Sequence, residues 1–140
     1  MTDLHAALGL SQLDRLPQFV HQRIAATALY QTLLQDLPVE LPAPAQDGVS
    51  AWHLYIVRLQ QPQLRRSVFE QLRAAGIGVN VHYIPIHTQP YYQQLGFHWG
   101  QYPHAEQFYS QIISLPLFAG ITVAQQQQVA SALRQALEQG

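Results

Sequence analysis

The side chains of this sequence that are best suited to chemistry gather in one stretch, VHYIPIHTQPYY (81–92). The stretch holds two histidines, three tyrosines and two prolines. A neutral imidazole can donate or accept a hydrogen bond, and it can also ligate a metal. The prolines disfavour a helix over this stretch, and such a density of aromatic side chains is not typical of a plain surface loop. These residues therefore form a site, a cover over a site made elsewhere, or an unusual part of the core.

The preceding residues, IGVNVHY (77–83), predict a strand that places His82 on a polar face. Side chains alternate along a strand, so three branched apolar residues share one face and three other residues share the opposite face: Ile77, Val79 and Val81 against Gly78, Asn80 and His82. Burying the polar groups without partners costs about 1–3 kcal/mol each. They are expected to face water, a ligand or a partner, with Pro85 ending the strand. The alternative is a structural histidine that is hydrogen-bonded to a backbone carbonyl.

The usual catalytic and metal-binding patterns are missing around these histidines. A metal held by His82 and His87 needs further ligands, yet the chain has no cysteine, and no carboxylate lies between Glu70 and Glu106. The sequence contains no G-x-S-x-G, no G-x-G-x-x-G and no phosphate-binding Walker pattern. We therefore expect no metal site, no hydrolytic triad and no catalytic residue in this chain.

Composition limits the partners of the chain. Of its 140 residues, 48% are hydrophobic and only 11% are charged, whereas globular proteins average about 25% charged residues. Either another domain or subunit covers part of the surface, or the sequence simply favours glutamine and arginine. The net charge is −1, and Arg65–Arg66 is the only adjacent basic pair, so nucleic acid binding is not expected. No apolar run reaches about 18 residues, and no signal peptide is evident, which predicts a cytoplasmic protein without a membrane segment.

The basic residues show an informative absence. All seven are arginine, at positions 15, 23, 58, 65, 66, 73 and 134, and the chain has no lysine. Chemistry that begins from a lysine amine, such as Schiff-base formation, cannot be completed by this chain alone.

The elements that must position the site alternate between helices and strands. Helices are predicted after Thr2, from Pro17 to Gln35, after Pro62, after Pro103 and after the T-x-x-Q capping box at Thr122; strands are predicted at 51–59, 77–83 and 114–118. Residues 36–50 are predicted to form an extended connector, and Gly76 is predicted to end the helix that follows Pro62. The predicted inward face of the helix after Pro103 consists of Ala105, Phe108, Tyr109 and Ile112. The pattern predicts an α/β fold with a small sheet of about three strands covered by helices.

Several segments together resemble a known family. They are MTDLHAALGLSQLDRL (1–16), AWHLYIVRL (51–59), GIGVNVHYIPIHTQPYYQQLGF (76–97), PHAEQFYSQIISLPLF (103–118) and ITVAQQQQVASALRQAL (121–137). In this order they resemble the DegT/StrS-type sugar aminotransferases, which are pyridoxal-phosphate enzymes of fold type I. The block VHYIPIH-x-QPYYQQLGF is most similar to the members of pseudaminic acid biosynthesis. Those enzymes aminate C4 of a UDP-linked 4-keto-6-deoxy-N-acetylhexosamine.

The resemblance implies that the chain corresponds to the C-terminal part of such an enzyme. Residues 1–35 would form the helical link between domains, and residues 36–140 the small two-layer α+β domain with a mostly antiparallel sheet. The large domain with the Schiff-base lysine is absent, so Met1 is either an internal methionine used as a start or the edge of a cut domain. Pyridoxal phosphate would belong to the complete enzyme, with none bound to this chain, which is expected to be inactive alone.

The resemblance also implies which residues face the substrate. His82 is the substrate-facing residue, with Tyr83, Asn80 and His87 as secondary candidates, and no catalytic or cofactor-binding residue is expected here. The partners would be a nucleotide-sugar (a UDP-sugar) and a second copy of the enzyme, with glutamate as the amino donor. Two alternatives stay open: a non-catalytic binding or regulatory module derived from the same fold, and a fragment that complements a separately made large domain. The exact sugar, the donor and the oligomeric state are not fixed by the sequence.

Overall fold

The computed structural model describes residues 1–43, 48 and 50–139. Its centre is a three-stranded antiparallel sheet in the order β1 (Val39–Glu40), β2 (Tyr55–Leu59) and β3 (Ile112–Leu115). The register pairs Val39 with Leu59 and Tyr55 with Leu115. The small antiparallel sheet predicted for the fold is confirmed, but β1 lies in the segment predicted as an extended connector (36–50), of which residues 44–47 and 49 lie outside the described residues.

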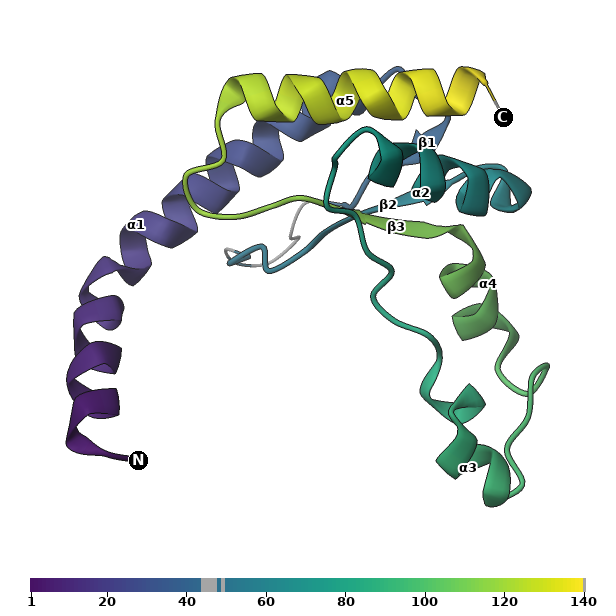
Figure 1. The fold of residues 1–140 in the computed structure, drawn as a ribbon, viewed down its shortest axis with the longest axis horizontal. Helices are drawn as coiled ribbons and strands as arrows, with labels where there is room; N and C mark the ends of the chain where they lie inside the picture. Colours follow the sequence, from purple (N-terminus) through teal and green to yellow (C-terminus); the bar gives the residue numbers. More distant parts are fainter. Residues whose placement is uncertain (44–47, 49, 140) are drawn as a thin grey trace.

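Helices cover one face of this sheet. They are the C-terminal part of α1 (Asp3–Leu34), together with α2 (Arg65–Ala74) and α5 (Val123–Glu138), and Figure 1 shows α5 and α2 lying along the same side of the strands. Alternate residues of β2 are buried, because one strand face meets the helices. The fully buried residues from this layer include Tyr30 and Leu34 of α1, Val68 and Leu72 of α2, Leu133 of α5, and Tyr55 and Val57 of β2. This sheet and these helices are called the body below.

Local signals set the ends of these helices as predicted. Thr122 and Gln125 form a reciprocal capping box at the start of α5. Pro62 opens a short 3₁₀ turn, η1 (Pro62–Leu64), that runs into α2. Gly76 follows α2 with φ of +78°, a conformation in which a residue with a Cβ is strained.

The prediction that Pro17 separates two helices is wrong. α1 is one helix of 32 residues with Pro17 inside it. Proline removes one helical hydrogen bond and usually bends the helix, and α1 changes direction in its N-terminal half (Figure 1). The residues from 7 to 18 are exposed, so water can bind the carbonyl that the proline leaves without a partner.

The predicted strand at 77–83 is also largely wrong. Only one bridge forms, between Asn80 and Ser114. The Asn80 side chain accepts a hydrogen bond from the next backbone amide, Val81 N, at 2.7 Å, and Val79 N donates to Ile77 O at 2.9 Å. Such local bonds compete with a ladder. The predicted alternation holds for burial only as far as Asn80: Ile77 and Val79 are buried and Gly78 and Asn80 are exposed, whereas Val81 and His82 are both partly buried.

Other predicted elements are shorter or shifted. The strand predicted at 51–59 begins only at Tyr55, and the one predicted at 114–118 is β3, which ends before Pro116. The prolines in 81–92 do not prevent helical turns: η2 (Ile86–Thr88) and α3 (Pro90–Gln94) form there, because proline fits the first helical position.

The helix predicted after Pro103 exists as α4 (Pro103–Gln111), but its predicted inward face is wrong. Ala105 and Phe108 are exposed and Tyr109 is only partly buried, whereas Ile112 is buried but belongs to β3. The two aromatic rings are covered by arginine side chains. The Arg58 guanidinium lies 5.8 Å from the Phe108 ring centroid, and the Arg65 guanidinium lies 5.3 Å from that of Tyr109. Cation–π contacts of this kind suit a surface.

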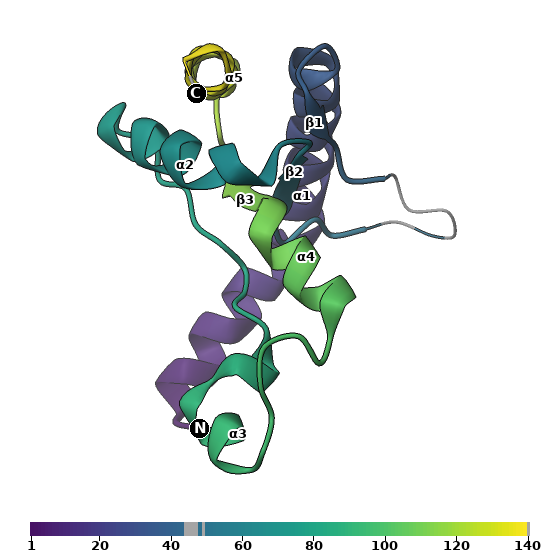
Figure 2. The ribbon, with the colours of Figure 1, turned by 90° about the vertical axis from the view of Figure 1, so that its right-hand side faces the viewer.

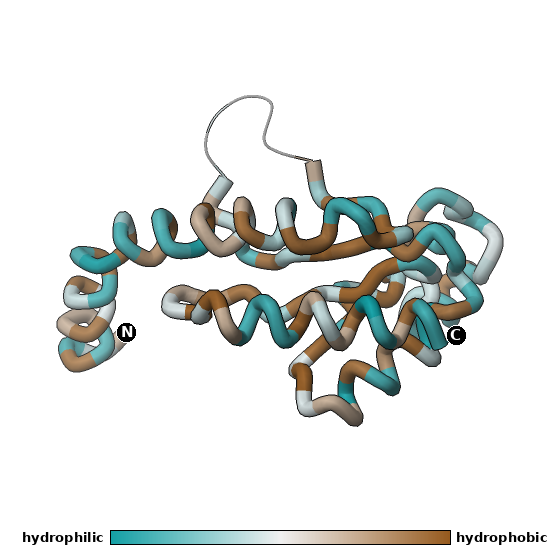
Figure 3. The backbone as a smooth tube through the Cα atoms, turned by 90° about the horizontal axis from the view of Figure 1, so that it is seen from above, coloured by the Kyte–Doolittle hydropathy of each residue, from teal (hydrophilic) through white to brown (hydrophobic). Residues whose placement is uncertain are grey.

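Two segments extend from the body on the same side (Figures 1 and 2). The helical arm is residues 3–18 of α1, of which none is buried. The aromatic arm is residues 83–102, which contain η2 and α3. Hydrophobic residues continue to the N-terminal end of α1 (Figure 3), and the exposed large apolar side chains of the two arms are Leu4, Leu8, Leu10, Leu13, Leu16, Tyr83, Ile84, Ile86, Tyr91, Leu95, Trp99 and Tyr102.

Candidate functional site

His82 lies where the aromatic arm leaves the body. The Asn80–Ser114 bridge fixes the backbone just before it, with Ser114 N donating to Asn80 O at 2.8 Å and Asn80 N donating to Ser114 O at 3.2 Å. His82 Nδ1 lies 2.8 Å from Ser114 Oγ, and the Tyr83 ring stands edge-on to the imidazole at 4.6 Å. His82 is partly buried. It is thus neither loose on the surface nor a core histidine bound to a backbone carbonyl.

The structure brings three of the four predicted site residues together. Asn80 and Tyr83 are exposed on either side of His82. The side-chain oxygen Oδ1 of Asn80 accepts a hydrogen bond from Val81 N, whereas Tyr83 is 69% exposed. These three residues form an open edge beside β3 that can present an imidazole and a phenol to a ligand.

His87 is placed differently from the other candidates. It is buried, with 6% of its surface exposed, and its Nε2 lies 2.9 Å from Glu106 Oε1. Its ring lies 4.7 Å from that of Tyr102. His87 therefore joins the aromatic arm to α4 and does not stand on the open edge with His82.

Glu106 is the centre of this attachment. Besides His87, its carboxylate accepts hydrogen bonds from Gly100 N at 2.7 Å and Tyr102 N at 3.2 Å. Desolvation alone would raise the pKa of Glu106, but the hydrogen bonds from His87, Gly100 and Tyr102 outweigh it and hold the pKa below the ordinary glutamate value. The carboxylate is thus ionised at neutral pH and pins the aromatic arm at several points.

The sequence predictions missed both Ser114 and Glu106. For Glu106 a signal existed, since its side chain is the only carboxylate between Glu70 and Glu138. A single carboxylate in such a long segment is expected to have specific hydrogen-bond donors. For Ser114 the sequence carries no comparable signal, because a serine in a strand has no distinguishing pattern.

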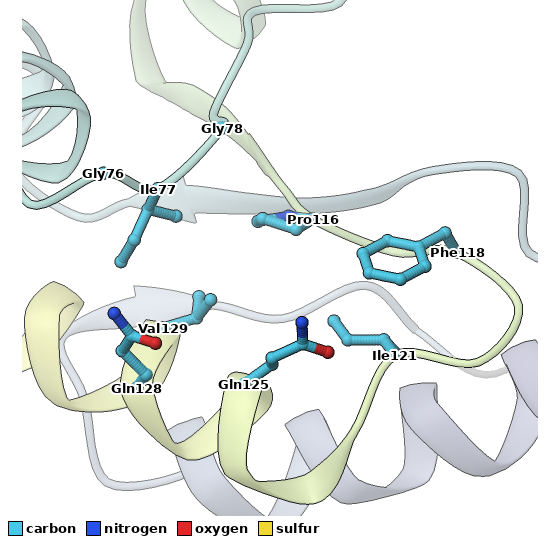
Figure 4. A pocket seen from close by; sticks show the side chains of 9 residues that line it. All are labelled: Gly76, Ile77, Gly78, Pro116, Phe118, Ile121, Gln125, Gln128 and Val129. Carbon is cyan, nitrogen blue, oxygen red and sulfur yellow. The ribbon is translucent and has the colours of Figure 1, made fainter.

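Two hollows lie near these residues. One of about 300 Å³ is set between the aromatic arm and α4 and is lined by Pro85, Ile86, His87, Tyr92, Phe97, Tyr102 and Ala105. Another, of about 450 Å³, lies between α5 and the segments around Ile77 and Pro116 (Figure 4). The second hollow presents the amides of Gln125 and Gln128, and Gln125 is already engaged in the capping box. It has no titratable lining residue, so acid–base chemistry has no group there.

The described residues contain neither a cluster of metal ligands nor a membrane-spanning helix. Within residues 1–43, 48 and 50–139, no three His, Asp or Glu side chains gather closely enough to share a metal ion. In that same part of the chain, no helix combines the length and the hydropathy required to cross a membrane.

The amino-acid sequence matches a known protein family. The sequence profile of the DegT/DnrJ/EryC1/StrS aminotransferase family matches residues 1–134. The chain is 38% identical over 128 residues to the spore coat polysaccharide biosynthesis protein SpsC of Bacillus subtilis (strain 168), covering 87% of this chain and 33% of that protein.

Solved structures agree with the sequence match. The putative sugar aminotransferase Spr1654 of Streptococcus pneumoniae, known in apo, PMP and PLP forms, superposes with a TM-score of 0.94 at 31% identity, covering 99% of this chain and 36% of that one. PseC of Helicobacter pylori, an aminotransferase involved in the biosynthesis of pseudaminic acid, gives a TM-score of 0.88 at 33% identity, covering 96% and 37%. This chain spans about a third of the length of these relatives.

Proposed function

Since the chain belongs to the DegT/DnrJ/EryC1/StrS aminotransferase family, we propose that it works as the small C-terminal domain of a pyridoxal-phosphate-dependent sugar aminotransferase. The observation that carries this proposal is the pair of arms. They extend from one side of the body (Figures 1 and 2) and leave large apolar side chains exposed. Extended apolar surfaces of this kind usually mark interaction sites, and a large domain or a second subunit would cover them.

The chain's own residues do not fit covalent attachment of the cofactor. It contains no lysine, so the lysine that holds pyridoxal phosphate in this class of enzyme has to come from another polypeptide segment. In this proposal the domain contributes a part of the sugar pocket and of the subunit contact, and it takes no part in covalent chemistry.

The proposed substrate is a nucleotide-linked 4-keto-6-deoxy sugar, with glutamate as the amino donor. The similarity to PseC supports a substrate of the kind used for pseudaminic acid. His82 would contact the nucleotide-sugar, with Tyr83 beside it, because these two rings stand together on the open edge next to β3. The complete enzyme would be a homodimer in which the arms help to close a site between subunits.

One observation favours a second function. A chain without lysine that still folds around a full core can act as a non-catalytic binding or regulatory module. The two functions differ in whether residues 1–140 support amino transfer when a lysine-bearing large domain is supplied.

A chimera tests the proposal. Residues 1–140 replace the matching third of the Streptococcus pneumoniae aminotransferase, and amino transfer from glutamate to a UDP-linked 4-keto-6-deoxy sugar is followed by mass spectrometry of the sugar. We expect the chimera to turn over and His82→Ala to lower kcat/KM by about tenfold or more, because a lost hydrogen bond to substrate costs roughly 1.4 kcal/mol or more in the transition state. His104→Ala, at an exposed histidine of α4, is the matched control and should be neutral. A folded, cofactor-loaded chimera without turnover would favour the non-catalytic module.

A further inference from the structure

Ser114 is built into the body at the point where His82 is held. It lies in β3, in which every residue is buried, and 4% of its own surface is exposed. Its backbone pairs with Asn80 in both directions, while its hydroxyl lies 2.8 Å from His82 Nδ1. One residue therefore fixes both the backbone that leads to His82 and one nitrogen of the ring.

The direction of this hydrogen bond follows from what the hydroxyl can reach. Within the described residues, His82 Nδ1 is the one side-chain partner of Ser114 Oγ. If Nδ1 carried the proton, the buried hydroxyl hydrogen would have no acceptor there, and an unpaired buried donor is costly. If Oγ–H donates to Nδ1 instead, the hydroxyl is satisfied and the ring proton sits on Nε2.

We propose that Ser114 is a positioning residue that holds His82 in its Nε2–H tautomer, so that the ring offers a hydrogen-bond donor to a ligand. The bond made by one ring nitrogen decides the state of the other. In the described residues no hydrogen bond is made by Nε2, which leaves it for a ligand. This role rests on the proposed function, in which His82 contacts the substrate. The Nε2–H then donates a hydrogen bond to an oxygen of the nucleotide-sugar, and the ring does not act as a proton acceptor.

Nitrogen NMR of the 140-residue chain tests this at a pH where histidine side chains are neutral. The ring ¹⁵N shifts of His82, assigned with His82→Gln, should report a single Nε2–H tautomer with Nδ1 as an acceptor. In Ser114→Ala the ratio of the two tautomers should move by roughly fivefold toward that of a free imidazole, which corresponds to one lost hydrogen bond. Ser114→Thr keeps the hydroxyl and should restore the single tautomer. Ser110→Ala removes a hydroxyl that binds only Gln107 O in α4 and should change nothing.

A wild-type His82 that carries its proton on Nδ1, or that shows the mixture of a free imidazole, would overturn the proposal. So would a Ser114→Ala variant that folds and keeps the wild-type tautomer. If Ser114→Ala does not fold, the tautomer in the wild type and in Ser114→Thr still decides the question. No sugar enters this measurement, so its failure is separate from a failure of the chimera to turn over.

Discussion

The body of this molecule buries its large apolar side chains, whereas the two arms leave many of theirs exposed. In the body, Leu133 of α5 and Leu72 of α2 are fully buried, and each helix contributes one face to a shared core. In the helical arm leucines are more frequent than in α2 or α5, yet Leu4 is 79% and Leu13 is 59% exposed. The body thus buries its apolar side chains within the chain, whereas the arms leave theirs exposed, and the proposed function assigns partners to them.

The two arms also differ from each other. The aromatic arm is attached through the His87–Glu106 contact and through Glu106 to the backbone at Gly100 and Tyr102. The helical arm buries none of its residues, and most of the stability of helices in proteins comes from tertiary packing of an apolar face. The aromatic arm is thus expected to keep its local structure in the free chain, while the helical arm gains most of its stability from a partner.

Truncation of a leucine should destabilise the chain far more in the body than in the helical arm. Leu133→Ala should lower the free energy of unfolding by about 2–5 kcal/mol, because it removes a fully buried leucine and leaves a cavity. Leu13→Ala is the matched change in the helical arm and should stay within about 0.5 kcal/mol, because the side chain touches mostly solvent. Urea unfolding followed by circular dichroism measures both, and equal losses would remove the distinction between body and arm.

A smaller, local effect is expected in the aromatic arm at acid pH. The pKa of Glu106 is depressed in the folded chain, with desolvation opposed by the hydrogen bonds from His87, Gly100 and Tyr102. The stabilising contribution of the carboxylate is therefore complete above the ordinary glutamate pKa of about 4.3. It is lost as the pH falls through the depressed value. Fluorescence of Trp99 in a Trp52→Phe background should report this loosening while the far-ultraviolet signal of the body persists.

Substitution of Glu106 tests whether its carboxylate holds the aromatic arm to α4. Glu106→Gln turns an amide group toward backbone donors, so the aromatic arm should be loosened already at neutral pH and should show no further acid transition. Glu70→Gln is the control, since Glu70 pairs with exposed Arg66 on the surface and, in the part of the chain that the structure describes, with no other cation. An acid transition of Trp99 that persists unchanged in Glu106→Gln would show that another group holds the arm.

The helix ends of the body were predictable because their signals are local, whereas β1 lies in the segment predicted as an extended connector. The capping box at Thr122 and the φ-positive Gly76 each mark a helix end through their own backbone requirements. The dense aromatic and branched apolar residues of 51–59 likewise predicted a strand, of which Tyr55–Leu59 form β2. Such features need no knowledge of the rest of the chain.

The failures lie where solvent or a competing side-chain hydrogen bond decides the outcome. Pro17 stays inside a helix because that part of α1 is solvated, which spacing alone does not reveal. The strand expected around Asn80 is reduced to one bridge because the Asn80 side chain competes for the next amide.

The candidate site shows the same division. His82 was found by pattern and by family resemblance, but its partner Ser114 lies 32 positions away and only the fold brings the two together. His87 was predicted as a secondary candidate beside His82, and its contact with Glu106 places it away from the open edge. Whether His82 meets a nucleotide-sugar stays a prediction.

Amide hydrogen exchange of the free chain and of the chimera tests the central claim, that the arms are docking surfaces for a part of the enzyme outside these 140 residues. In the free chain, residues 3–18 should exchange with little protection, while β2 and α5 should be protected by global stability. In the chimera, exchange of residues 3–18 should slow by at least about tenfold, a gain of roughly 1.4 kcal/mol, with little change in β2 and α5. A helical arm that is already protected in the free chain, or that exchanges equally fast in the chimera, would contradict the account.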